Sequence, residues 1–254
     1  MCNPGSIKKN ENMKYCFVLF SMLILGSCQP QPTKDSRFEL GWYGAMRSIM
    51  HEGGLSGQVG VADLLAKPHV YALGAMENLK GELLIWDGKP VIAQVKDSTL
   101  LLSQDRSGKA ALAVYASVPH WGKVIPIPYN VRTYEELENF IKVAARKEQL
   151  DTEQPFPFLI EAKVNKLDYH IIDWPESDTV HTHEKHRQSG MQGALSSTPV
   201  KILGFYSAHH HGVFTHHSTN MHLHFMAVEA PIAGHVDSLI LEKGMGGLFF
   251  PEGE

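Results

Sequence analysis

Residues 218–238 read STNMHLHFMAVEAPIAGHVDS and carry the pattern that decides the fold. Apolar residues alternate there with His222 and His224, which is the spacing of a β-strand whose successive side chains point to opposite faces. The residues after this strand supply Pro and Gly for a turn. A hairpin folded about a midpoint near Glu229 places His235 opposite His224, with Cβ atoms about 5 Å apart on one face.

Three imidazoles on one face of a rigid hairpin form a set of ligands for a metal ion. The pattern therefore predicts that His222, His224 and His235 bind Zn²⁺ or another divalent metal. Three protein ligands leave positions open for water or substrate, which is typical of catalytic rather than structural zinc. The alternative for any single histidine is a polar residue satisfied by hydrogen bonds. The shared face of all three favours the metal site.

Histidine is concentrated in one part of the chain, because eleven of the fifteen lie between His181 and His235. Histidine-rich loops also bind metal without a specific site, so those outside the hairpin are expected to be bystanders, with a second site or a role in the pocket as the alternative. These residues are His181, His183, His186, His209, His210, His211, His216 and His217.

The N-terminal residues 1–27 resemble a lipoprotein signal peptide, with Met13 as its expected start. A polar leader is followed by the apolar run YCFVLFSMLIL, which has the length of a signal sequence core and is too short to span a membrane as a helix. The sequence LGSC then ends at Cys28, the expected lipidation site. A signal peptide cut elsewhere and a buried N-terminal helix are the alternatives.

The rest of the chain is expected to be a short tether, residues 28–36, and one folded domain, residues 37–254. All three cysteines lie at or before Cys28, so the domain has no disulfide and no thiolate. Without residues 1–27, 20 basic residues face 26 acidic ones and no basic stripe appears, which argues against nucleic acid as a partner. We expect an extracytoplasmic protein that is anchored to a bacterial membrane only through an acyl chain.

The domain reads as α+β, strand-rich, with mixed or antiparallel sheets and few helices. Asp87 and Gly88 signal a tight hairpin turn, and Thr133 and Glu136 form a capping box before an apolar helical stripe. A second, weaker helix is expected over Phe38–Met50. The expected strands cover residues 71–75, 81–86, 89–95, 110–117 and 158–164, and a polar stretch covers residues 175–198.

Two stretches resemble the bacterial alpha-acetolactate decarboxylase family. GFYSAHHHGVFTHHSTNMHLHF at 204–225, followed by GHV at 234–236, is similar to the family's G-F…H-x-H-F…G-G-H-V pattern, whose outer zinc ligands are also thirteen residues apart. Upstream, LGAMENLKGEL at 73–83 is similar to the family's G-x-x-x-x-L-x-G-E segment, whose Glu lies beside the metal and matches Glu82. The resemblance implies an acetolactate decarboxylase-like fold, a zinc site and, as in other members, a homodimer.

Glu82 is also unusual without the resemblance, because it begins an apolar strand where a carboxylate must be paired or bound. An exposed charge at the strand end is the alternative. The resemblance implies decarboxylation of 2-acetolactate to acetoin and CO₂, with the metal as a Lewis acid that stabilises an enediolate. Glu82 is then expected both at the metal and as the catalytic proton donor.

The chain departs from the family in how it would bind the substrate carboxylate. The family's Arg is expected within Tyr169–Trp174, where this chain has none, and Lys163 is the candidate replacement as a catalytic residue, although a Lys is not a bidentate fork. The family's C-terminal Glu could be replaced by Glu252 or Glu254 if the tail folds back. A related 2-hydroxy-3-keto acid is therefore an alternative substrate.

Two further functions stay open from the sequence. The first is a non-catalytic surface lipoprotein that binds zinc. The second is a metal-dependent hydrolase on the same three-histidine site, in which Glu82 would serve as the general base.

Overall fold

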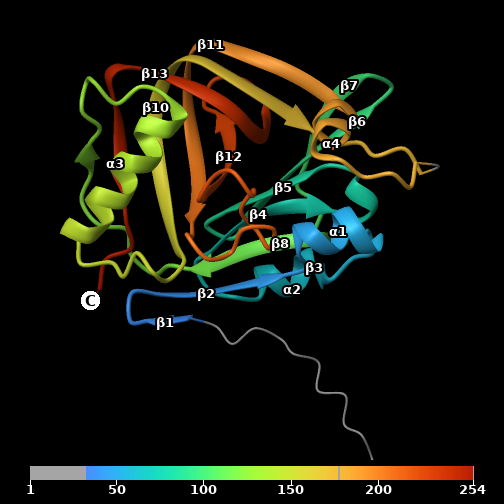
Figure 1. Cartoon of the computed structure of the whole chain (residues 1–254), viewed down its shortest axis with the longest axis horizontal. Helices are drawn as coiled ribbons and strands as arrows, with labels where there is room; N and C mark the ends of the chain where they lie inside the picture. Colours follow the sequence, from blue (N-terminus) through green and yellow to red (C-terminus); the bar gives the residue numbers. More distant parts are fainter. Residues whose placement is uncertain (1–32, 177, 254) are drawn as a thin grey trace, which may run out of the picture.

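Two antiparallel sheets build the fold, and each belongs to a different half of the chain (Figure 1). The structure, a computed structural model, describes residues 33–176 and 178–253. The first sheet has the order β1-β2-β8-β4-β5-β6-β7, and β3 pairs with β8. Its strands are β1 (Thr33–Asp35), β2 (Phe38–Tyr43), β3 (Val59–Gly60), β4 (Val70–Met76), β5 (Glu82–Trp86), β6 (Lys89–Lys96), β7 (Thr99–Ser103) and β8 (Lys109–Ser117).

The second sheet has the order β10-β11-β12-β13-β9, and β10 also pairs with β13. Four of its strands therefore close into a ring in which no long edge stays unpaired, and such closure removes the backbone edge that would otherwise attract another chain. Its strands are β9 (Ile125–Pro126), β10 (Phe156–Ile171), β11 (Met191–Tyr206), β12 (Met221–Ala227) and β13 (Ala233–Phe249).

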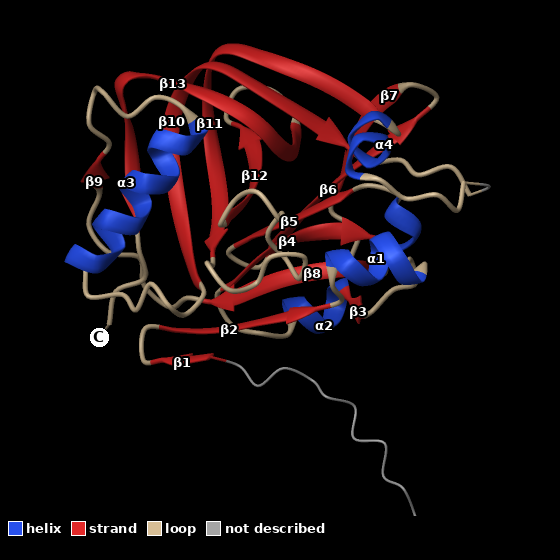
Figure 2. Cartoon of the chain, viewed as in Figure 1, coloured by secondary structure: helices blue, strands red, loops and turns tan. Residues whose placement is uncertain are grey.

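Few helices accompany the sheets, as Figure 2 shows by colour. The capping box of the longest helix is present, since Thr133 Oγ1 accepts from the Glu136 amide and the Glu136 carboxylate accepts from the Thr133 amide. The helices are α1 (Met46–Glu52), α2 (Val61–Leu65), the 3₁₀ turn η1 (Glu77–Leu79), α3 (Tyr134–Lys147) and α4 (His183–Gln188). The predicted strand-rich α+β class is confirmed.

The main core lies between the two sheets and reaches under α3. Leu73 and Leu84 of the first sheet join Phe158 and Phe225 of the second in one buried cluster, to which α3 contributes Ile141. A smaller cluster on the first sheet includes residues of α2, and a third lies near α1. Burial of apolar side chains from both sheets fixes their relative placement, because apolar area removed from water is the main stabilising term.

The helix expected over Phe38–Met50 is wrong in its first half. Phe38 and Leu40 are buried and Glu39 is exposed, so this stretch follows the period of two that is typical of a strand and pairs with β8. Gly44 has φ 71° and turns the chain into α1. The range expected as a tether, residues 28–36, also contains β1, which pairs with β2.

The expected polar stretch over residues 175–198 contains α4 and the first half of β11. The predicted signal peptide and Cys28 lie outside the described residues. Within the described ranges, no helix is both long and apolar enough to cross a membrane.

Candidate metal centre

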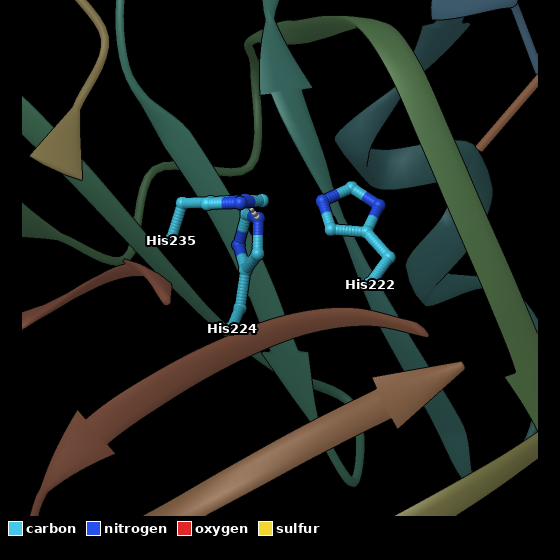
Figure 3. A group of neighbouring side chains, drawn as sticks. All are labelled: His222, His224 and His235. Carbon is cyan, nitrogen blue, oxygen red and sulfur yellow. Dashed lines mark hydrogen bonds between the residues drawn. The ribbon is translucent and has the colours of Figure 1, made fainter. Parts of the chain in front are cut away.

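The β12–β13 hairpin brings three histidine rings together (Figure 3). His224 pairs directly with His235 across the two strands, as the sequence predicted. His222 lies two residues before His224 and shares its face of β12. The ring centroids are 5.0–5.2 Å apart, and one nitrogen from each ring lies within 4.8 Å of the others.

The three rings fit a divalent metal better than they fit a closed network of hydrogen bonds. His222 Nδ1 and His224 Nδ1 are buried and have no hydrogen-bond partner among the described residues. His224 Nε2 lies 3.3 Å from His235 Nδ1. Two nitrogens bound to one tetrahedral zinc ion at 2.0–2.1 Å are also separated by about 3.3 Å.

Burial keeps these histidines neutral, which is the form that binds metal. It lowers the pKa of His222 to about 4, and burial followed by the charges of neighbouring histidines lowers the pKa of His224 and His235 well below the ordinary range. Binding of a metal therefore displaces few protons from the rings near neutral pH.

Glu82 joins the site from the first sheet. Its carboxylate lies 3.6 Å from His224 Nε2 and accepts a hydrogen bond from the Ile172 amide. Gly81 makes this placement possible, because its φ is 127° and a Cβ atom there would lie 2.5 Å from the Ala93 carbonyl oxygen. Burial raises the pKa of Glu82 to about 7, opposed by the nearby charge of His170.

His170 and Asp237 complete the polar cluster, and sequence reasoning missed both. His170 Nδ1 lies 2.9 Å from Asp237 Oδ1, and His170 Nε2 lies 3.7 Å from Glu82. Burial alone would lower the pKa of His170, but the hydrogen bond to Asp237 and the charge of Glu82 raise it above its ordinary value. His170, His235 and Asp237 form a second group whose atoms could hold a metal.

One signal for these residues was present in the chain. Asp237 lies two residues after His235, so both project from the same face of a strand. His170 pairs with His235 across β10 and β13, and it falls within the segment where the resemblance expected an Arg. The other residues of that segment are not at the centre: Asp173 pairs with Lys80, and Trp174 is buried in a separate apolar cluster.

Lys163 is not part of the site, which corrects the expectation that it replaces the missing Arg. It forms an ion pair of 3.0 Å with Glu242 and lines a different hollow. The physical reason is its position on β10, seven residues before His170, since a strand of that length covers roughly 20 Å. Glu252 does not line the cavity at the metal centre either, and Glu254 lies outside the described residues.

The polar cluster opens into a cavity of about 640 Å³. Glu82, His170, His222 and His235 line it together with side chains from α1, α3 and α4. Among the described residues that line this cavity, Arg187 of α4 is the only lysine or arginine. A concave site with several converging polar groups of shifted pKa is typical of an active site.

Most histidines outside the hairpin contact other partners. The ring of His181 stacks on Trp174 and contacts His186, and the rings of His216 and His217 lie 3.9 Å apart. His186 and His216 line the cavity, which leaves them a place in the pocket. The run at 209–211 has separate contacts: His209 with Glu153, His210 with Trp42 and Phe214, and His211 with Asn220.

The environment of Glu82 predicts how stability depends on pH. Because its pKa rises from 4.5 to about 7 on folding, the folded metal-free protein binds more protons than the unfolded chain between these pH values. We therefore expect the unfolding free energy to fall by about 3 kcal/mol, relative to that of Glu82→Gln, as the pH rises from 4.5 to 7. Urea denaturation with a chelator present measures the difference, and equal pH slopes for the two proteins would contradict it.

Comparisons with known proteins agree with this geometry. A family model described as alpha-acetolactate decarboxylase matches residues 42–246. The crystal structure of alpha-acetolactate decarboxylase from Bacillus subtilis strain 168 is 16% identical, with a TM-score of 0.64 and coverage of 84% of this chain and 85% of that one. A Staphylococcus aureus protein of unknown function, described as similar to alpha-acetolactate decarboxylase, is 17% identical, with a TM-score of 0.63 and coverage of 83% and 84%. No curated protein sequence matches.

Proposed function

The chain belongs to the alpha-acetolactate decarboxylase family, and on that premise we propose that it is a metal-dependent decarboxylase of 2-acetolactate or a related 2-hydroxy-3-keto acid. The observation that supports this proposal most is the convergence of three buried histidines and Glu82 in one cavity. In the reaction, the bond to the carboxyl carbon breaks, CO₂ leaves and a proton takes its place. The product is an α-hydroxy ketone, which is acetoin for 2-acetolactate.

His222, His224 and His235 are the proposed ligands of Zn²⁺ or another divalent ion, with Glu82 as a further ligand. Such an ion supplies Lewis-acid stabilisation of the negative charge that develops when CO₂ departs. Neutral rings and a spacing that suits tetrahedral coordination support the assignment.

Glu82 is the proposed proton donor. A pKa of about 7 keeps a large share of this buried carboxyl group protonated near neutral pH, where a general acid is most effective. His170 and Asp237 form a hydrogen-bonded pair beside it and are placed to hold its orientation and to exchange protons with it.

The proposed partner of the substrate carboxylate is Arg187, because it is the only permanently charged cation among the described residues that line the cavity. A charge-assisted hydrogen bond contributes about 1.5–3 kcal/mol. Arg187→Gln is therefore expected to raise KM roughly 10- to 100-fold, with a smaller change in kcat. Steady-state kinetics measure both constants. Arg106→Gln on the exposed loop before β8 is the matched control, and an unchanged KM in the Arg187 variant would contradict the assignment.

The test of the proposed function is one experiment on the purified full chain. Metal content is measured by elemental analysis, and CO₂ and acetoin are measured during incubation with racemic 2-acetolactate. Bound metal with release of both products, abolished by a chelator and restored by Zn²⁺, supports the proposal. Bound metal without turnover of any 2-hydroxy-3-keto acid would instead favour a zinc-binding protein or, if esters or amides are cleaved, a hydrolase.

We also propose that the protein is an extracytoplasmic lipoprotein anchored through an acyl chain on Cys28. Support comes from the LGSC sequence that follows an apolar run. Cys28→Ser is expected to move the protein out of the membrane fraction, as measured by immunoblot of fractionated cells. Continued membrane association of this variant would contradict the anchor.

A further inference from the structure

One part of the cavity lining is apolar and rigid. Ile49 of α1 is buried with Leu79, Leu112 and Ile172 in a single hydrophobic cluster. All four also line the cavity, together with Met46 and Met50. We call these six residues the apolar wall.

The position of the apolar wall is fixed by backbone contacts at α1. The Met46 amide donates to the Val213 carbonyl oxygen and the Arg47 amide to the Gly212 carbonyl oxygen, each at 2.8 Å. Gly53 ends the helix in the left-handed conformation, with its amide bonded to Ser48. The wall is therefore a stable surface of the cavity rather than a loose loop above it.

The polar groups of the cavity come from other elements. Glu82 begins β5, His170 lies on β10, and His222 and His235 lie on β12 and β13. The cavity therefore has a reactive polar part and an apolar part, and a ligand that fills both must itself be polar at one end and apolar at the other.

The size of the cavity sets the scale of that ligand. Cavities of about 300–1,000 Å³ hold ligands of drug size, and this one measures about 640 Å³. In 2-acetolactate both groups attached to the reacting carbons are methyl groups. Such a small acid fills the polar part and leaves the apolar wall facing water, which is unfavourable.

We propose that the substrate is a 2-hydroxy-3-keto acid with an alkyl group longer than methyl next to the reacting carbons, and that this group lies against the apolar wall. The inference rests on the proposed function and narrows its substrate class. The atoms of the reaction do not change: CO₂ leaves, a proton replaces it, and the product is a longer α-hydroxy ketone.

The first test measures kcat/KM for two series of acids on the zinc-loaded protein. One series lengthens the alkyl group at carbon 2 from methyl to hexyl, and the other lengthens the group on the ketone side. We expect a rise of about fourfold for each added methylene in at least one series, as burial of the methylene predicts. A flat or falling kcat/KM in both series would overturn the inference while leaving the decarboxylase activity in place.

A binding test separates failure of this inference from failure of the proposed function. Calorimetry measures the affinity of 2-alkyl-2-hydroxy acids, which lack the keto group and cannot react by this route. An affinity that rises about fourfold per methylene supports the apolar wall as a ligand site even if no acid is turned over. Affinity that does not depend on chain length in either group of compounds overturns it.

Variants of the wall provide the structural control. Met46→Gln combined with Met50→Gln keeps the shape of two partly buried side chains and makes them polar. The ratio of kcat/KM for the longest acid to that for 2-acetolactate is expected to fall at least about tenfold. Met245→Gln, an exposed methionine outside the cavity, should leave this ratio unchanged. An unchanged ratio in the double variant counts against the proposal.

Discussion

Replacing His224 with alanine is expected to remove the bound metal and to lower kcat/KM for decarboxylation by roughly 10³-fold or more. Loss of a group that only supports a metal ligand typically costs 10- to 100-fold in affinity or activity, so loss of one of three direct ligands costs more. His224 is nearly fully buried between the other two rings and Glu82, and solvent cannot easily supply a replacement ligand.

The matched control for this result is His209→Ala. His209 lies in the histidine-rich loop, is exposed, and contacts Glu153 instead of the hairpin. Elemental analysis and kinetics on both variants separate a specific site from loop binding. If the His209 variant loses the metal and the His224 variant keeps it, the hairpin is not the metal centre. His235→Ala provides a second test in case the His224 variant does not fold, which circular dichroism would show.

The Glu82→Gln variant is expected to keep the metal and to lower kcat by about 10²- to 10⁴-fold, the range typical of general acid catalysis. The Gln side chain can still accept the hydrogen bond from the Ile172 amide, so the local structure should persist. It cannot release a proton to the substrate. Three histidines remain as ligands, which separates proton delivery from metal binding.

Metal analysis and single-turnover kinetics check the Glu82 prediction. Glu153→Gln, which changes an exposed glutamate outside the cavity, controls for the removal of one negative charge. A kcat within a few-fold of the original would exclude Glu82 as the proton donor. Loss of the metal together with activity would instead assign Glu82 mainly as a ligand.

The hairpin could be predicted from sequence because its information is local. Alternation on β12 and a turn of known position were enough to pair His224 with His235, and the structure confirms that pairing. The strand that carries Glu82 is also confirmed, although its approach to the histidines depends on the packing of two sheets. No local pattern specifies that packing.

The missed and wrong assignments share one physical cause, which is long-range strand pairing. His170 reaches the site because β10 pairs with β13, whose residues come more than sixty positions later. Lys163 lies on the same strand but too far along it, and a prediction of strand without register could not separate the two. Arg187 was missed because α4 lies within a stretch that reads as a polar loop.

The most direct test of this account is the position of zinc in a crystal of the zinc-loaded protein, located by anomalous diffraction above and below the zinc absorption edge. The account predicts a peak 2.0–2.1 Å from one ring nitrogen each of His222, His224 and His235. A peak only at the histidines of residues 209–217, or none at the hairpin, would contradict the metal centre on which the proposed function depends.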